Sequence, residues 1–177
     1  MLGLACNARG AWPTTDEISE LGLPGNWVRS IVYDQDEFDR AVQQTPADVL
    51  ICALLQPAET RGIAADGTGW LPVVTEFAER FSGRVGAVEL RNEVDLGRIA
   101  VELAIQNVRE ASSILRRHGM LVVSPSVAGP LWQEYITVLG PAVQGYADLQ
   151  AFHPYTQRAK RFPASLFADD PEHEIDL

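Results

Sequence analysis

The sequence predicts a single α/β domain built on a parallel sheet. Strand-like and helical segments alternate along the 177 residues, which is typical of consecutive βαβ units. One strand-like segment, residues 48–54, is an almost continuous apolar run, as expected for a strand covered on both faces. We predict that this domain spans residues 1–160. Residues 161–177 form an acidic tail without helical or strand periodicity, which we expect to be mobile.

The individual elements follow from periodicity and from start and stop signals. The predicted strands are residues 2–7, 27–33, 48–54, 85–91, 120–124 and 147–153. The predicted helices begin near Thr14, Asp34, Pro72, Arg98 and Leu131. Asp34 can accept hydrogen bonds from the first turn of its helix, and Pro72 suits a first turn because it lacks an N–H. The helices that begin near Arg98 and Leu131 are expected to end near His118 and Leu139.

Two architectures satisfy this alternation, an open doubly wound sheet and a (β/α)8 barrel. The first strand-to-helix turn, residues 6–10, lacks the G-x-G-x-x-G pattern that would indicate dinucleotide binding. A complete barrel usually needs about 250 residues. This chain would therefore supply only part of one.

Composition narrows the range of partners. The net charge of −10 argues against nucleic acids and anionic membranes, because phosphate groups would be repelled overall. No apolar run approaches the roughly 20 residues of a membrane span. The N-terminus lacks the basic start of a signal peptide, so the cytoplasm is the default location. Cys6 and Cys52 are expected to be free thiols, and no metal-binding spacing or cofactor motif is present.

Polar residues mark three of the predicted strands, one near the start of strand 27–33 and two at the ends of strands 85–91 and 147–153. The relevant stretches are Asn26-Trp27-Val28-Arg29, then Glu89-Leu90-Arg91-Asn92-Glu93-Val94-Asp95, then Asp148-Leu149-Gln150-Ala151-Phe152-His153-Pro154-Tyr155. The carboxyl ends of parallel strands meet at one edge of the sheet, where such folds carry their chemistry. Any one of these stretches is common in proteins, whereas all three in this order are a more specific signal of a protein family.

The set resembles the clan A glycoside hydrolases, which are retaining enzymes with a (β/α)8 barrel. This resemblance covers the predicted strands from residue 2 to residue 155 and implies a TIM-barrel-like repeat, a partial barrel of about six parallel strands with outer helices. It implies that Glu93 is the general acid/base and that Asn92 bonds the sugar 2-hydroxyl. It further implies that Arg29 orients the nucleophilic carboxylate, while His153 and Tyr155 line the sugar pocket.

Each of these assignments has a structural alternative. Glu93 could instead form an ion pair with Arg98 in the following helix, and Asn92 could be a plain turn residue. Arg29 could form an ion pair inside the barrel, and His153 could be a hydrogen-bonded structural residue. Trp12 and Trp70 are predicted to lie in loops at the same edge, where an aromatic ring can stack on a sugar. Packing in the core is the alternative for both tryptophans.

The sequence departs from the family pattern in three ways. Arg91 stands where many relatives have Trp, and Val94 stands where Pro is frequent. More seriously, the chain ends before the seventh strand, which in the family carries the nucleophilic Glu. A retaining mechanism needs two carboxyl groups about 5–5.5 Å apart, and the second has no evident position in this sequence.

Three hypotheses follow from the sequence. The chain is a glycoside hydrolase acting on oligo- or polysaccharides, with its barrel completed by further sequence, a second copy or a partner chain. Alternatively, it is a non-catalytic carbohydrate-binding or structural barrel remnant within a larger assembly. The third is an unrelated doubly wound protein that binds a small ligand. Unpaired strand edges favour self-association or a partner chain.

Overall fold

A parallel sheet forms the centre of the molecule. The computed structural model describes residues 3–7, 12, 16, 27–94, 96, 100–128, 132–151 and 153. The strands are β1 (Gly3–Asn7), β2 (Trp27–Ile31), β3 (Leu50–Leu55), β4 (Ala87–Leu90) and β5 (Leu121–Val123). Each coincides with a predicted strand to within a few residues. The predicted α/β class with parallel strands is therefore confirmed.

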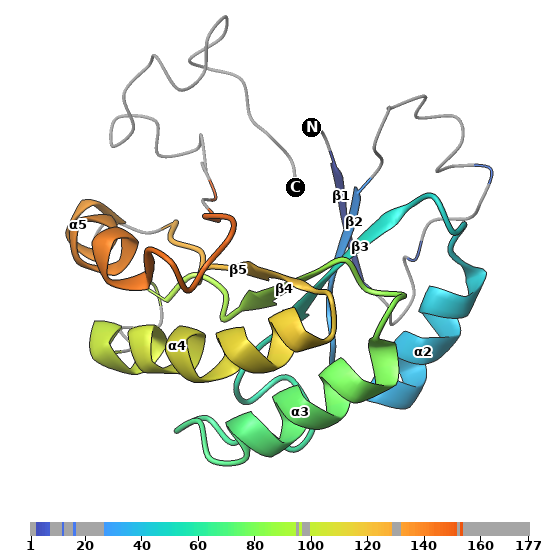
Figure 1. The fold of residues 1–177 in the computed structure, drawn as a ribbon, viewed down its shortest axis with the longest axis horizontal. Helices are drawn as coiled ribbons and strands as arrows, with labels where there is room; N and C mark the ends of the chain where they lie inside the picture. The colour runs from blue at the N-terminus through green and yellow to red at the C-terminus, as the bar shows by residue number, and fades with distance from the viewer. Residues whose placement is uncertain are drawn as a thin grey trace, which may run out of the picture.

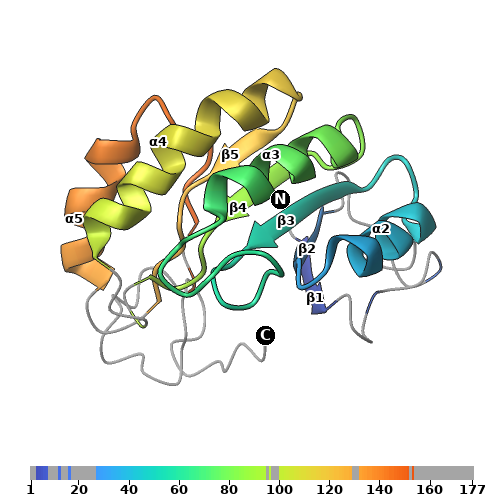
Figure 2. The same ribbon diagram turned by 90° about the horizontal axis from the view of Figure 1, so that it is seen from below.

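The strands are hydrogen-bonded in sequence order, β1-β2-β3-β4-β5, and each pair is parallel. The helices lie on one face of the sheet (Figure 1, Figure 2). A doubly wound sheet instead has a point where strand order reverses, with helices on both faces. That alternative is wrong for the described strands. The described sheet is not closed, because β1 and β5 are not paired with each other.

Four of the predicted helices are present in the described residues. Their bounds are α2 (Gln35–Gln44), α3 (Trp70–Phe81), α4 (Val101–Arg117) and α5 (Trp132–Val143). Asp34 caps α2 as predicted, because its Oδ1 accepts the backbone N–H groups of Asp36 and Glu37 at 2.8 and 3.2 Å. Pro72 lies in the first turn of α3, also as predicted.

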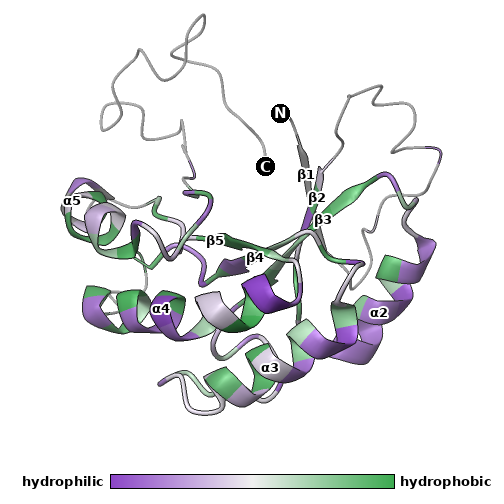
Figure 3. Ribbon diagram, in the orientation of Figure 1, coloured by the Kyte–Doolittle hydropathy of each residue, from purple (hydrophilic) through white to green (hydrophobic). Residues whose placement is uncertain are grey.

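The hydrophobic core lies between the sheet and these helices. An aromatic cluster joins α2 to α3: the rings of Phe38 and Phe81 are 5.3 Å apart between centroids, and those of Phe77 and Phe81 are 4.6 Å apart. All three rings are fully buried. Figure 3 shows hydrophilic and hydrophobic residues alternating along the helices, whereas β3 is hydrophobic over most of its length. This distribution is that of amphipathic helices covering a buried strand.

The predicted sixth strand, residues 147–153, is not a regular strand in the structure. Its described part runs beside β5 and forms one parallel bridge, between Val123 and Leu149. The Asp148 carboxylate accepts the backbone N–H of Val122 at 2.8 Å, in the place where a strand would offer a carbonyl. The prediction of about six strands is therefore corrected: the described sheet has five regular strands. In the sixth predicted segment, the Asp148 side chain takes the place of a backbone carbonyl as hydrogen-bond acceptor.

Three further expectations differ from the structure or fall outside it. Helix α5 extends past its predicted end near residue 139, through Pro141 to Val143, because Leu139 and Val143 are buried one turn apart. The predicted helix near residues 14–22, apart from Asp16, and the tail at residues 161–177 lie outside the described residues. Among the described residues, no helix combines the length and the apolar character needed to cross a membrane.

We predict that Phe77→Ala lowers the free energy of unfolding by about 3–5 kcal/mol, because it leaves a cavity in the aromatic cluster. Leu71→Ala on the same helix is the control, since Leu71 is 37% exposed and little apolar contact is lost. Urea unfolding followed by circular dichroism measures both. Equal losses in the two variants would contradict the described core.

Candidate functional site

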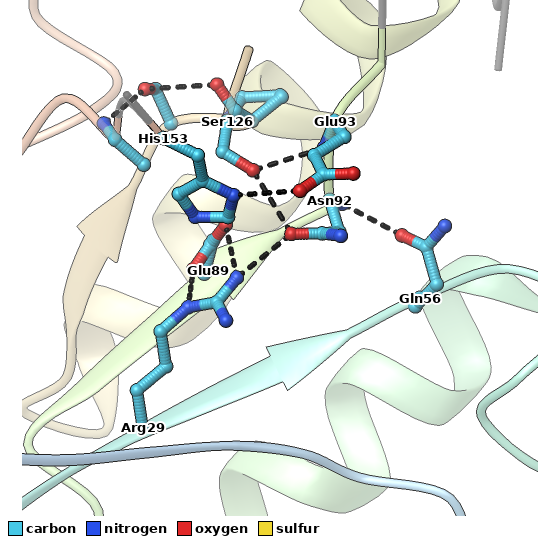
Figure 4. A network of polar contacts seen from close by, with 10 residues as sticks. Arg29, Gln56, Glu89, Asn92, Glu93, Ser126 and His153 are labelled. Atoms are coloured by element: carbon cyan, nitrogen blue, oxygen red, sulfur yellow. Dashed lines mark hydrogen bonds and ion pairs between the residues drawn. The ribbon is translucent and has the colours of Figure 1, made fainter. Parts of the chain in front are cut away.

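The candidate site begins where β4 ends. The chain continues from Leu90 through two non-glycine residues with positive φ, Arg91 at 77° and Glu93 at 46°. Such angles are strained for residues with a side chain and persist only where neighbouring contacts enforce them. Here the backbone N–H of Arg91 bonds Leu55 O at 3.0 Å, and that of Glu93 bonds Ser126 Oγ at 2.9 Å. The strained turn directs Asn92 and Glu93 into one polar network (Figure 4).

A buried ion pair forms the base of this network. Arg29 on β2 donates to both carboxylate oxygens of Glu89 on β4, with Nε–Oε2 at 2.6 Å and Nη2–Oε1 at 3.0 Å. The Glu89 side chain is 2% exposed and that of Arg29 is 27% exposed. Burial opposes the charged guanidinium, but the hydrogen bond and charge of Glu89 outweigh it and raise the pKa of Arg29.

Asn92 is held in one orientation by two donors. Its Oδ1 accepts Arg29 Nη2 at 2.9 Å and the Ser126 hydroxyl at 3.2 Å. Its backbone N–H donates to Gln56 Oε1 at 2.7 Å. Because a guanidinium only donates, the atom facing Arg29 must be the amide oxygen. The Asn92 amide nitrogen is thereby turned away from Arg29.

Glu93 is paired with His153, which comes from the segment beside β5. The Glu93 Oε1 and His153 Nδ1 atoms are 3.0 Å apart, and the two side chains are 17% and 16% exposed. The backbone N–H of His153 donates to Val127 O at 3.0 Å, which fixes this segment against the residues after β5. The carboxyl group is therefore oriented and partly accessible, as a proton-transferring group must be.

The structure thus brings together four of the residues that the sequence singled out: Arg29, Asn92, Glu93 and His153 (Figure 4). Tyr155 lies outside the described residues.

The two tryptophans are placed elsewhere. Trp12 donates its indole N–H to Thr45 Oγ1 at 3.0 Å and packs edge-on against Phe38. Trp70 is 3% exposed in the core beside Arg91. The structure does not bring either ring into the polar network. Both rings therefore pack against other residues, which was the alternative to sugar stacking in the sequence analysis.

Sequence reasoning assigned no role to Glu89, Ser126 or Gln56. Glu89 carried a signal, because it is a charged residue inside an otherwise apolar predicted strand and needs a buried partner. Arg29 carried the matching signal on its own strand. Ser126 and Gln56 carried none, since hydroxyl and amide residues in loops are common. Their positions depend on how the loops fold over the end of the sheet.

The network combines a held amide, a histidine and a carboxyl group, which suits hydrogen bonding to hydroxyl-rich ligands and proton transfer. The described residues contain no group of three or more His, Cys, Asp or Glu side chains arranged to hold a metal ion. No protein-family model matches the chain, and no curated protein or solved structure matches it significantly.

We predict that Arg29→Met destabilises the protein by about 3 kcal/mol, because it leaves the Glu89 carboxylate buried without a counter-charge. The double variant Arg29→Met/Glu89→Met should recover most of this loss, since the unpaired charge is then gone. Guanidinium chloride unfolding of both single variants and the double variant gives the coupling free energy. Additive losses would show that the two side chains are not paired.

The Cys52 thiol gives a second prediction. Burial, helped by the nearby Glu89 charge, raises the pKa of Cys52 to about 12. The thiolate is the reactive form, so iodoacetamide at pH 8 should leave Cys52 unmodified in the folded protein and alkylate it in urea. Peptide mass spectrometry measures this, with Cys6 observed in the same samples. The neutral Cys52 thiol should contribute its full stabilisation below the ordinary thiol pKa. That stabilisation should be lost as pH rises towards 12, because the unfolded chain releases the thiol proton first.

Proposed function

We propose that the chain carries the acid/base half of a glycoside hydrolase site, with Glu93 as the general acid/base and an oligo- or polysaccharide as substrate. The observation that carries this proposal is the Glu93 carboxyl group, 17% exposed and held 3.0 Å from His153. Beside it, Asn92 is fixed by Arg29 and Ser126. The resemblance to clan A glycoside hydrolases assigns these residues to the same roles.

The proton-transfer role requires a carboxyl group that can give up a proton and take it back. During glycoside hydrolysis an acid protonates the leaving oxygen and then, as a base, removes a proton from water. Glu93 is accessible enough to meet a substrate, and its hydrogen-bonded position beside His153 limits its rotation. His153 would also contact the sugar through its ring.

Asn92 would bind the sugar as a donor. Its Oδ1 is occupied by Arg29 and Ser126, so its amide N–H groups remain for a ligand hydroxyl. A hydrogen bond to the 2-hydroxyl strengthens in the transition state and contributes to catalysis. In this proposal Arg29 acts through Asn92 and Glu89 and is a positioning residue.

Glu89 does not fit the role of nucleophile. Its carboxylate is 2% exposed and both oxygens accept from Arg29, so a substrate carbon cannot approach it. A retaining mechanism would therefore take its second carboxylate from outside the described residues. We propose that the open sheet is one wall of a barrel and that further chain, a second copy or a partner completes it. The sequential strand order and one-sided helices support this.

The second candidate is a non-catalytic carbohydrate-binding or structural module. The observation that favours it is the same neutralised Glu89, which leaves Glu93 as the one partly exposed carboxyl group within the described network. Such a module would bind sugars through Asn92 and His153 without cleaving them.

We predict that Glu93→Gln lowers kcat/KM for aryl glycosides by about 100-fold or more in the protein that holds the second carboxylate, whether further chain, a second copy or a partner supplies it. Glu76→Gln is the matched control, because Glu76 lies on the exposed side of α3 away from the network. Release of the aryl group measures turnover. Activity that survives in Glu93→Gln would remove Glu93 from its role.

If the wild type shows no turnover, sugar binding tests the non-catalytic candidate. We expect oligosaccharide binding to weaken about tenfold in Asn92→Ala, since a partly buried donor is lost. Isothermal titration calorimetry measures this, with Glu76→Gln as the control that leaves affinity unchanged. Absence of both turnover and binding would reject the carbohydrate proposal for this chain.

A further inference from the structure

Ser126 follows the end of β5 and lies against the strained turn after β4. It is 0% exposed and belongs to a run of buried residues, 122–128, that continues past the strand. Its backbone N–H donates to Arg91 O at 3.2 Å, and its carbonyl oxygen accepts the Val94 N–H at 3.0 Å. These two bonds lie on either side of Asn92 and Glu93 in the chain. The backbone of Ser126 therefore spans the turn from which both site side chains project.

The Ser126 hydroxyl makes two hydrogen bonds of opposite sense. The backbone N–H of Glu93 can only donate, so Ser126 Oγ is the acceptor of this bond, which is 2.9 Å long. A guanidinium also only donates, so Arg29 faces the amide oxygen of Asn92. The same Asn92 Oδ1 must then accept the Ser126 O–H, at 3.2 Å. One hydroxyl group thus links the backbone of Glu93 to the side chain of Asn92.

Few side chains can take the place of this hydroxyl. Alanine has no polar atom beyond its backbone, and the thiol of cysteine is a weak donor and a weak acceptor. Because Ser126 is fully buried, the loss of one oxygen atom leaves too little space for a water molecule to replace it. Threonine keeps a hydroxyl oxygen at the same position. The two bonds therefore require a serine or a threonine here.

The bond to Glu93 stabilises a backbone angle that a residue with a side chain adopts at a cost. Glu93 has a φ of 46°. Without the Ser126 hydroxyl its N–H would lose its acceptor, which favours relaxation of the turn. His153 is held independently, since its backbone N–H donates to Val127 O at 3.0 Å. The 3.0 Å contact between the Glu93 carboxyl group and His153 therefore depends on the Ser126 hydroxyl.

We propose that Ser126 is a positioning residue of the candidate site, whose hydroxyl directs the Glu93 carboxyl group towards His153 and holds the Asn92 amide. The catalytic consequence rests on the proposed function, in which Glu93 transfers the proton. A misplaced acid slows proton transfer. Sugar binding is less affected, because Arg29 still orients Asn92. Removal of the hydroxyl should therefore lower kcat and leave KM nearly unchanged.

Amide hydrogen exchange followed by NMR tests the positioning without any substrate. Ser126→Ala should speed exchange of the Glu93 amide by about tenfold or more, because this N–H loses its acceptor. The Arg91 amide, bonded to Leu55 O at 3.0 Å, should keep its protection. Ser112→Ala is the matched control, since Ser112 is a buried serine whose hydroxyl bonds a carbonyl oxygen within α4. It should leave exchange of the Glu93 amide unchanged.

Kinetics in the protein that holds the second carboxylate test the catalytic consequence. Ser126→Ala and Ser126→Cys should each lower kcat for an aryl glycoside by about tenfold or more. Ser126→Thr should recover both kcat and the slow exchange of the Glu93 amide, because it keeps the hydroxyl. Ser126→Cys covers the case in which Ser126→Ala fails to fold, because cysteine fills a similar space. Ser112→Ala should leave kcat and KM unchanged.

Two results would overturn the assignment of Ser126. One is unchanged exchange of the Glu93 amide in a folded Ser126→Ala or Ser126→Cys variant. The other is faster exchange together with an unchanged kcat. Absence of turnover in the wild type and in every variant would instead reject the glycoside hydrolase role. In that case exchange of the Glu93 amide still decides whether Ser126 positions the turn.

Discussion

The bidentate pair between Arg29 and Glu89 is the interaction on which the polar end of the sheet depends. The parallel register places Arg29 level with Cys52 on β3 and with Ala87 on β4, so Glu89 lies two residues further along β4. The small side chains at that level leave room for Arg29 to cross β3 and reach Glu89. A carboxylate that is 2% exposed is tolerated only with such a partner. The same guanidinium then orients Asn92.

The turn after β4 divides its side chains between two environments. Positive φ angles at Arg91 and Glu93 reverse the alternation that a continuing strand would impose. Asn92 and Glu93 consequently join the network with His153, while Arg91 enters the core between α3 and α4. Each such angle costs on the order of 1–3 kcal/mol, which the contacts of Ser126, Gln56 and Leu55 offset.

The one-sided arrangement of helices gives the two faces of the sheet different surroundings. The face towards the helices contains the main core, including the aromatic cluster of Phe38, Phe77 and Phe81. The other face contains Cys52, Ala87 and Val123 as a smaller apolar cluster next to the Arg29–Glu89 pair. Leu50 and Leu121, at the beginnings of their strands, are 41% and 42% exposed. In the proposed completed barrel, the further chain, second copy or partner would cover such residues.

The sequence by itself determined the βα repeat, most strand positions, the Asp34 cap and the cluster of polar residues at the end of β4. These features depend on local periodicity and capping, which neighbouring residues decide. The resemblance to clan A glycoside hydrolases singled out Arg29, Asn92, Glu93 and His153, which the structure brings into one polar network. Tertiary structure alone decided that Ser126 and Gln56 hold Asn92 and Glu93 and that Asp148 interrupts the sixth predicted strand. These outcomes depend on which distant side chains meet when the loops close over the sheet, and no local pattern encodes those meetings.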